Sequence, residues 1–301
     1  MDRLGVMETY IAVVEAGSFS GAARILNLGQ PAISKSIAQL EERLGARLLL
    51  RSTRGLATTD AGQQFYERAK LAVREVDEAE QLVRQASGSL SGRLRISAAV
   101  TFASLHVVPL LAEFLALHPQ LEVDLQLSDA NIDLLEEGID VALRMGSLED
   151  SAMTARHIAQ CPRLVIGTPD YFGRAGIPAT PAELSRHQAI VYARRGGGEA
   201  WSFSRNGTEV AIAVSGRMRV NAAEGMRAAV LGGMGIAIAS QWMFAPELRT
   251  GQVQAVLTDW TLPAVDLWAV FPTGRLVTAR ARAFVSFVEE ALARARREAS
   301  S

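Results

Sequence analysis

A small group of polar side chains, close together in the sequence, has the chemistry to read nucleic acid. Gln30, Ser34, Lys35 and Ser36 supply one amide, two hydroxyls and one ammonium group, and Pro31 stands among them. Such groups hydrogen-bond to base edges and phosphate oxygens when a helix presents them in the major groove of DNA. Proline is tolerated in the first turn of a helix. These five residues are therefore predicted to form the DNA-contacting start of a helix.

A turn and a second helix are needed to position those side chains. Ala22, Ala23 and Leu26 give the preceding helix an apolar face, and Gly29 breaks the chain between the two helices. The following helix ends at Gly45. Its apolar residues recur at spacings of four, three and four: Ile33, Ile37, Leu40 and Leu44. This layout is typical of a helix-turn-helix, although polar side chains also cover any solvated helix surface.

The segment 47–59 predicts a β-hairpin wing after the second helix. It combines an apolar strand, a turn and two arginines, Arg51 and Arg54, which we expect to contact phosphates or enter the minor groove. Between Arg24 and Arg54, six basic and two acidic residues give a net charge of +4, whereas the whole chain has a formal net charge of −1. The basic surface is therefore local. Glu41 is expected to be a structural ion-pair partner, because its carboxylate would repel phosphate.

One long helix is predicted over residues 60–86. It has an apolar seam with a 3.5-residue repeat: Phe65, Ala69, Ala72, Val76, Ala79, Val83 and Ala86. An amphipathic helix packed on its own domain would show the same seam. We favour a dimerisation helix, because a helix-turn-helix protein normally reads two half-sites with two-fold symmetry.

These motifs as a set resemble the LysR-type transcriptional regulators. The resemblance rests on Ala22-Ala23, Leu26, Gln30 to Ser34, Ile37, Leu40-Glu41, Leu44-Gly45, Arg51 and Asp60-Ala61-Gly62. Three residues depart from the pattern of the family, namely Gly29, Leu49 and Thr58. All three fall on caps or packing positions, so they put local stability in question more than DNA binding.

The resemblance implies an α/β protein in three parts. These are a winged helix-turn-helix over residues 1–59, a linker and dimerisation helix over 60–88, and a two-lobed domain over 89–301 that resembles periplasmic binding proteins. Lobe I would cover about 91–162 and 267–301, and lobe II about 163–266. The implied partners are double-stranded DNA with a dyad-symmetric operator, a small-molecule effector and RNA polymerase. A homodimer or homotetramer is implied as well.

The pattern after residue 92 supports an α/β domain independently of the resemblance. Strands are predicted over 94–99, 121–128 and 140–145, with helices over 105–117 and 131–137 between them. A second set of strands is predicted near 189–192, 210–214 and 236–240. A helix is expected to begin after Asn221, with Asn221 as its cap and Glu224 three residues later. The C-terminal helix, about 279–296, is expected to return to lobe I.

Candidate effector-binding residues follow from the rule that ligands of open α/β sheets bind beyond the carboxyl ends of strands. They are Val100, Thr101, Phe102 and Ser104 after the first strand, Ser128 and Asp129 after the second, Arg144 and Gly146 at the third, and Tyr192 and Asn221 from the other lobe. Ordinary helix capping is an equal alternative for Thr101 and Ser104. For Arg144, a structural salt bridge or a hydrogen bond to backbone is favoured.

Other function classes find little support in the sequence. The four histidines are scattered, no phosphate-binding loop is present, and the glycines at 232, 233 and 235 follow a helix, the reverse of the dinucleotide-binding order. No cofactor, metal or enzymatic activity is expected. The single cysteine, Cys161, excludes an internal disulfide and predicts a small buried residue. The first residues show no signal peptide, so a cytoplasmic protein without a membrane span is expected.

Two other hypotheses remain open from the sequence alone. One is a DNA-binding or architectural protein that responds to no effector. The other is a solute-binding or enzymatic domain fused to a helix-turn-helix.

Overall fold

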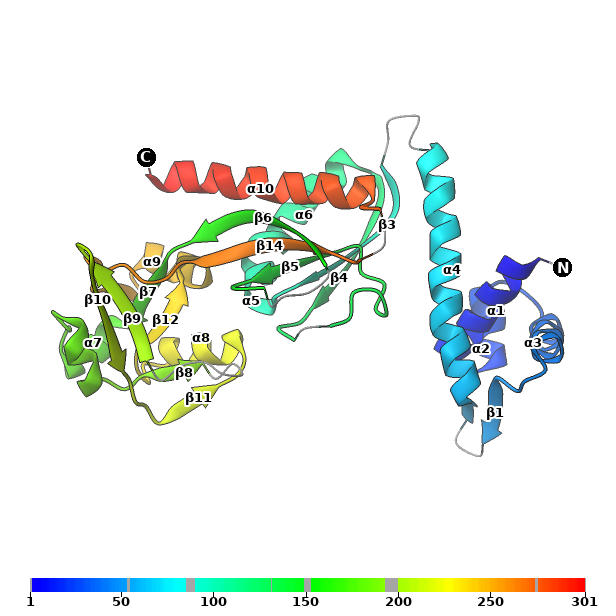
Figure 1. The fold of residues 1–301 in the computed structure, drawn as a ribbon, viewed down its shortest axis with the longest axis horizontal. Coiled ribbons are helices and arrows are strands. Elements are labelled where there is room, and N and C mark those ends of the chain that lie inside the picture. The colour runs from blue at the N-terminus through cyan, green and yellow to red at the C-terminus, as the bar shows by residue number, and fades with distance from the viewer. Residues whose placement is uncertain are drawn as a thin grey trace. The chain divides into compact units, whose positions relative to one another are not determined.

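The chain forms two compact units, Met1–Ser89 and Leu90–Ser301. The computed structural model describes residues 2–52, 55–84, 90–130, 132–148, 153–192, 200–273 and 276–300. Figure 1 shows the elements of both units. The unit of residues 1–89 contains α1 (Arg3–Glu15), α2 (Phe19–Ile25), α3 (Gln30–Leu44), β1 (Leu49–Ser52), β2 (Gly55–Thr58) and α4 (Asp60–Arg84). The predicted helix-turn-helix, hairpin and long helix are all present.

Local signals define the helix-turn-helix. The hydroxyl of Ser18 accepts the Gly21 N–H and caps the start of α2. Asn27, with φ 52°, ends that helix in the left-handed region. Gly45 does the same for α3, with φ 64°. The turn between α2 and α3 is therefore tight, and it orients the start of α3.

Helix α1 was missing from the sequence prediction and completes the core of this unit. Asp2 caps α1 by accepting the Leu4 and Gly5 N–H groups. Its Val6, Tyr10 and Val13 side chains are buried at spacings of four and three residues. These three side chains pack against the predicted apolar stripe of α3, which consists of Ile33, Ile37 and Leu40. The signal for α1 was therefore present in the sequence, as a capping residue followed by a helical repeat.

The backbone of Leu48, just before the wing, joins several elements. Its N–H and that of Leu49 both donate to Oε1 of Glu41 on α3, at 2.7 and 3.1 Å. Its carbonyl oxygen accepts the backbone N–H of Thr59 at 2.9 Å. A Cβ on Gly62 would lie 2.0 Å from that oxygen, so only glycine lets the first turn of α4 approach so closely. The wing is thus fixed to α3 on one side and α4 on the other.

The seam of α4 divides into two parts. Phe65 packs edge-on against Tyr10 with ring centroids 5.3 Å apart, and Ala69 is buried. This first part covers the core of its own unit. Farther along, Val76 is 39% exposed and Ala79 is exposed. Only the later part of the predicted seam is left open to another molecule.

The second unit begins with a five-stranded mixed sheet, which we call lobe I. Its strand order is β4 (Gln120–Leu127), β3 (Ser91–Ala98), β5 (Val141–Met145), β14 (Val265–Phe271) and β6 (Thr154–Cys161). β3 is parallel to β4 and β5, whereas β14 is antiparallel to β5 and β6. Its helices are α5 (Val100–Phe102), the π-helical turn η2 (Ala103–Val107), α6 (Val108–Leu117) and α10 (Ala279–Ser300). α6 and α10 pack on one face through Phe114 and Phe284 (Figure 1).

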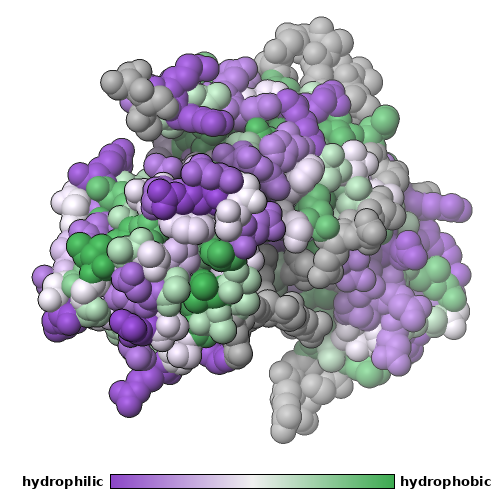
Figure 2. Space-filling view, turned by 60° about the vertical axis from the view of Figure 1, so that its left-hand side comes forward, coloured by the Kyte–Doolittle hydropathy of each residue, from purple (hydrophilic) through white to green (hydrophobic). Residues whose placement is uncertain are grey.

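Lobe II lies between β6 and β14 in the chain. One sheet joins β12 (Ala237–Ser240), β7 (Arg163–Gly167) and β13 (Gln254–Val256), and two pairs join β8 (Ile190–Tyr192) to β11 (Met218–Val220) and β9 (Ala200–Arg205) to β10 (Thr208–Ala213). The helices are α7 (Pro169–Ala175), η3 (Pro181–Arg186), α8 (Ala223–Leu231), η4 (Gln241–Phe244) and α9 (Ala245–Thr250). Trp201 and Phe203 lie in its core. On the side turned forward in Figure 2, hydrophobic residues form small groups among hydrophilic ones.

Two local predictions in the second unit were wrong. The predicted helix over 131–137 is only a turn in the described residues 132–138, because Asp133 accepts the N–H groups of Leu135 and Glu136 and Gly138 has φ 66°. Asn221 is not the cap of α8. That helix begins one residue later, with Ala222 at the cap position and no side-chain cap.

One stretch of the described chain, Val100–Leu117, is long and apolar enough to cross a membrane by length and composition. Its Phe102, Val107 and Phe114 side chains are buried in the core of lobe I. This stretch is therefore a packed helix of the folded lobe. Of its residues, 28% are buried, and Val108 and Leu117 are exposed.

The Glu41 contacts lead to a direct test of how the wing is held. Replacing Glu41 by alanine leaves two N–H groups without an acceptor, which costs about 2 kcal/mol of local stability. The amides of Leu48 and Leu49 should then exchange their hydrogens about 30-fold faster in the full-length protein. Hydrogen exchange followed by mass spectrometry measures this.

Glu42 is the matched control for that experiment. It is the next residue on α3, it is exposed, and none of the wing amides donates to it. Glu42→Ala should leave exchange at residues 48 and 49 unchanged. Equal exchange rates in the Glu41 and Glu42 variants would show that the wing is held by other contacts.

Candidate DNA interface and effector site

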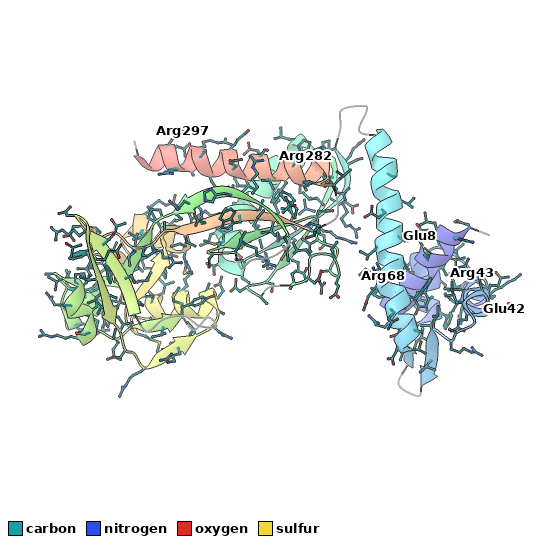
Figure 3. All side chains as sticks on the ribbon, viewed as in Figure 1. Glu8, Glu42, Arg43, Arg68, Arg282 and Arg297 are labelled. Carbon is teal, nitrogen blue, oxygen red and sulfur yellow. The ribbon has the colours of Figure 1, made fainter. Side chains whose placement is uncertain are left out.

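The first half of α3 presents the polar side chains that the sequence singled out. Gln30, Pro31 and Lys35 are exposed, and Ser34 is half-buried. No hydrogen bond from the side chains of Gln30, Ser34 or Lys35 is seen within the described part of the chain. Farther along α3, the exposed side chains of Glu42 and Arg43 project outward (Figure 3). The start of α3 therefore offers an amide, a hydroxyl and an ammonium group that the fold itself does not use.

Ser36 lies on a different side of α3 from Ser34. A helix turns by 100° per residue, so the two side chains are about 160° apart around its axis. The buried residues Ile33, Ile37 and Leu40 occupy the face between them. Gln30 and Ser34 thus belong to one side of the helix, and Ser36 to the other.

The arginines of the wing are only partly covered by the structure. Arg51 is in β1, and its backbone pairs with Leu56. Arg54 lies outside the described residues, and so does the side chain of Arg51. Nearby, Arg47 forms an ion pair with Glu41 at 3.3 Å, and its side chain is 82% exposed. Glu41 is the structural ion-pair partner that the sequence predicted.

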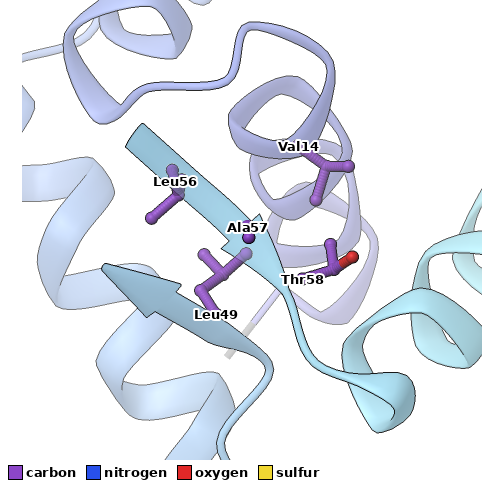
Figure 4. Close-up of a pocket in the computed structure, with 5 residues that line it drawn as sticks. All are labelled: Val14, Leu49, Leu56, Ala57 and Thr58. Atoms are coloured by element: carbon purple, nitrogen blue, oxygen red, sulfur yellow. The ribbon is translucent and has the colours of Figure 1, made fainter. Parts of the chain in front are cut away.

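A small hollow lies where the wing meets the end of α1. It has a volume of about 270 Å³, and Figure 4 shows its lining side chains, Val14, Leu49, Leu56, Ala57 and Thr58. Apart from the Thr58 hydroxyl, which contacts Gln63 at 3.3 Å, the lining is aliphatic. None of its lining side chains is charged, and we assign no ligand to it.

A second polar site lies at the start of the helix that follows β3. This helix runs without a break from Val100 to Leu117. Ala99 precedes it and supplies no side-chain cap. Instead, the Val100 N–H donates to Oδ1 of Asp129, which lies in the loop after β4, at 3.1 Å. A carboxylate at this place also interacts favourably with the positive end of the helix dipole.

Two buried hydroxyls close in the sequence to that helix start have no hydrogen-bond partner among the described residues. Ser97 is fully buried near the end of β3, and Thr101 in the first turn is 4% exposed. Thr101 therefore does not cap the helix, although capping was an equal alternative for it. A buried hydroxyl without a partner costs free energy unless a ligand or water completes it. Of the other candidates here, Val100 is half-buried, Phe102 is in the core and Ser104 is exposed.

The remaining lobe I candidates hold the surrounding loops. The Ser128 hydroxyl accepts the Ala130 N–H at 3.1 Å. Nη1 of Arg144 donates to the carbonyl oxygen of Ser128 at 3.3 Å, a bond to backbone of the kind favoured from the sequence. Gly146 has φ 95° and accepts the indole N–H of Trp268 at 3.0 Å. The Ser128 hydroxyl, Nη1 of Arg144 and the Gly146 carbonyl thus have structural partners.

Contacts with lobe II come from the same helix. Phe102 packs against Trp242 with ring centroids 5.3 Å apart, and Nε2 of His106 donates to the Trp242 carbonyl at 2.8 Å. Burial lowers the pKa of His106, so the ring is neutral and donates its single proton there. Of the lobe II candidates, Tyr192 packs at the edge of a core cluster and Asn221 is exposed.

Prediction from the sequence did not identify Ser97 and Trp242 as residues near this helix start, nor Asp129 as its cap. Ser97 was visible as a hydroxyl between Ile96 and Ala98 near the end of its strand. Asp129 was noted after its strand, but its bond to Val100 joins residues 29 positions apart. Trp242 gave no signal, because its position depends on how the two lobes pack. Among the described residues, no cluster of three histidine, cysteine or acidic side chains that could hold a metal ion is found.

Comparison with known proteins identifies the family. The model of the LysR substrate binding domain matches residues 87–293, and that of the bacterial regulatory helix-turn-helix protein, lysR family, matches residues 4–63. The chain belongs to the family of LysR-type transcriptional regulators. The first match covers both lobes, and the second covers α1 to the first turn of α4.

Several LysR-type relatives extend over nearly the whole chain. An HTH-type transcriptional regulator of Xanthomonas campestris pv. campestris (strain 8004) is 36% identical over 93% of this chain and 82% of the relative. An HTH-type transcriptional repressor of Pseudomonas aeruginosa (strain UCBPP-PA14) is 31% identical, covering 97% and 93%. The solved structure of CrgA, a LysR-type transcriptional regulator from Neisseria meningitidis, has a TM-score of 0.61 at 30% identity, covering 95% of this chain and 98% of that one.

Proposed function

We propose that this LysR-type regulator binds a dyad-symmetric DNA site as a homodimer or homotetramer, under the control of a small molecule bound between its lobes. RNA polymerase is the partner through which such binding would act on transcription. The proposal has a DNA-reading part, a pairing part and an effector part. Each is supported by a different observation.

The DNA-reading part is supported by the unused polar groups at the start of α3. Gln30, Ser34 and Lys35 are available to contact base edges and phosphate oxygens, next to Pro31 and with Ser36 on the other flank. Arg51 and Arg54 are the proposed phosphate contacts of the hairpin. We therefore assign base reading to Gln30 and Ser34, and phosphate contact to Lys35 and the two arginines.

The pairing part is supported by the exposed apolar residues of α4. The later part of the α4 seam is open, with Val76 39% exposed. On α6 of lobe I, Val108 is 46% and Leu117 61% exposed, but nine residues apart they lie on opposite sides of the helix, so the pairing proposal rests on α4. Two copies related by two-fold symmetry would match two half-sites of DNA.

The effector part rests on the buried, unpartnered hydroxyl of Thr101. This hydroxyl lies in the first turn of the helix that contacts lobe II through Phe102. A ligand bound there would therefore alter how the two lobes pack. We propose Thr101 as the centre of the site. The other proposed contacts are Val100, Phe102, Ser104, Ser128, Arg144, Gly146, Tyr192 and Asn221. A ligand that prefers one arrangement of the lobes shifts the population toward it.

Lys35→Ala tests the proposed phosphate contact of α3. If the ammonium group contacts phosphate, its loss reduces the slope of log affinity against log salt concentration by about 0.9 per subunit. Binding to the operator should weaken while the melting temperature stays the same. A salt series of gel-shift titrations measures the slope.

Arg205→Ala in lobe II is a charge-matched control for that experiment. Arg205 forms an ion pair with Asp259 on lobe II at 2.7 Å. Its replacement should leave the slope unchanged. An unchanged slope in the Lys35 variant as well would exclude the proposed contact.

Thr101→Val tests the effector part, because valine has nearly the same shape without the hydroxyl. The ligand-free protein should melt at the same or a higher temperature, since no hydrogen bond is lost. A ligand that raises the melting temperature of the natural protein should no longer do so. Thermal shift with a panel of amines, amino acids, organic acids and aromatic compounds measures both effects.

Thr168→Val is the matched control in lobe II. The Thr168 hydroxyl accepts the Tyr171 N–H and caps α7, so its loss should cost about 1 kcal/mol without changing the ligand response. A Thr101 variant that responds to ligand like the natural protein would refute the effector site. A natural protein that responds to no compound, in melting or in operator binding, would favour an effector-independent DNA-binding protein.

A further inference from the structure

One threonine joins the wing to α4. Thr59 is the single residue between the end of β2 at Thr58 and the start of α4 at Asp60. Its side chain is half-buried, and its hydroxyl accepts the Gly62 N–H at 2.9 Å. An oxygen that accepts an N–H group of the first turn caps a helix, and threonine is among the residues preferred there. The capped helix thus begins directly where the wing ends.

The same hydroxyl also bonds to the entry of the wing. It donates to the carbonyl oxygen of Arg47 at 2.8 Å and reaches that of Leu48 at 3.4 Å. These two residues lie directly before β1, and the Thr59 N–H donates to the Leu48 carbonyl as well. A hydroxyl has one proton to donate and an oxygen that accepts. A single side chain therefore bonds to the entry of the wing and to the first turn of α4.

Other contacts of α4 hold it to α1. Its Phe65 packs against Tyr10 of α1, and the hydroxyl of Tyr66 donates to Oε1 of Glu15 at 2.9 Å. α3 packs on α1 in the same core. α3 and α4 are therefore joined through α1. Loss of the Thr59 hydroxyl should loosen the wing relative to α4, while α3 and α4 keep their arrangement.

Two attachments to different elements fix the direction of a hairpin, whereas one leaves it able to turn. Glu41 of α3 supplies the first attachment, by accepting the N–H groups of Leu48 and Leu49. The Thr59 hydroxyl supplies the second, toward α4. The two do not compete, because Glu41 accepts N–H groups and Thr59 donates to a carbonyl oxygen.

We propose that Thr59 is a positioning residue that couples the wing to the dimerisation helix and thereby sets where the wing meets DNA. The inference rests on the proposed pairing of two copies through α4 and on the proposed phosphate contacts of the wing. Two-fold pairing gives the two α4 helices a fixed relation. A wing tied to α4 is then held at a set distance from the wing of the other copy. Phosphate contacts position a protein on DNA, so this tie decides which phosphates the wing reaches.

A distance measurement in the full-length protein without DNA tests the coupling. Spin labels on Leu50→Cys in β1 and Arg68→Cys in α4 report the distance between wing and helix by double electron–electron resonance. Both positions are exposed (Figure 3 labels Arg68), whereas the natural Cys161 is buried. An excess of unlabelled protein keeps the label pairs within one copy. The distance distribution should be about twofold broader in Thr59→Val than with the natural threonine, because the hydrogen bonds of the hydroxyl are lost.

Three further variants separate coupling from helix capping. Thr59→Ser keeps the hydroxyl and should keep the narrow distribution. Thr59→Asp keeps an oxygen that can cap α4, but it has no proton for the Arg47 carbonyl, so the distribution should be as broad as in Thr59→Val. Thr58→Val is the matched control, because the Thr58 hydroxyl contacts the side chain of Gln63. Its distribution should stay narrow.

Hydroxyl-radical footprinting on the operator measures the consequence for DNA. The positions whose protection is lost in Arg51→Ala mark the contact of the wing. Thr59→Val should reduce protection at the same positions by at least about twofold, and should keep it at the positions that depend on Gln30. Thr59→Ser should keep both.

The outcomes separate this inference from the proposed function. A distribution in Thr59→Val or Thr59→Asp as narrow as with the natural threonine would overturn the coupling, and so would equal broadening in Thr58→Val. Unchanged protection in Thr59→Val, at positions that Arg51→Ala loses, would show that the tie does not position the wing on DNA. If Arg51→Ala also keeps all protection, the proposed phosphate contact fails, while the distances still decide the coupling.

Discussion

The carboxylate of Glu41 holds the DNA-binding unit in one arrangement. It extends from the recognition helix α3 and accepts two backbone N–H groups at the entrance to the wing, those of Leu48 and Leu49. Apolar packing alone would bury these groups without partners, and hydrogen bonds are directional where apolar contacts are not. The orientation of the hairpin relative to α3 therefore depends on this residue. The DNA contacts that we propose for helix and wing depend on it in turn.

In the second unit, two further carboxylates accept backbone N–H groups from elements that are distant in the sequence. Asp129 accepts the Val100 N–H from the helix after β3. Asp140 accepts the Arg95 N–H of β3 and pairs with Arg280 on α10, where both side chains are only 5% exposed. A buried pair of this kind fixes geometry more than it adds stability. In each case a carboxylate joins elements that are distant in the sequence, and one of these junctions lies where a ligand would bind.

The parts of the fold that depend on local signals could be predicted from the sequence. The helix-turn-helix followed from the Ile33, Ile37 and Leu40 repeat and from Gly29 and Gly45, because periodicity and turn residues act over a few positions. The helix expected over 131–137 was wrong, since the side chain of Asp133 bonds to the backbone and competes with helix formation. The split of the α4 seam also escaped prediction, because Phe65 packs against Tyr10 of a helix that the sequence analysis did not include.

The proposed effector site was harder to predict for the same reason. The strand-end rule led to Thr101 and to the loop of Asp129, but not to their roles, which depend on contacts between distant residues. Ser128 and Arg144 were chosen as ligand contacts, and both hold the loop. Trp242 is recognisable only once the lobes are packed. The strand-end rule thus names candidate residues, whereas their hydrogen-bond partners depend on the fold.

Selection of bound DNA from a random pool by the full-length protein tests the central claim most directly. Two copies that each insert α3 into the major groove would select an inverted repeat, with half-sites about one helical turn, or a multiple of it, apart. The affinity of the protein for the selected DNA should fall when Lys35 or Gln30 is replaced. A selected motif without two-fold symmetry would contradict the account.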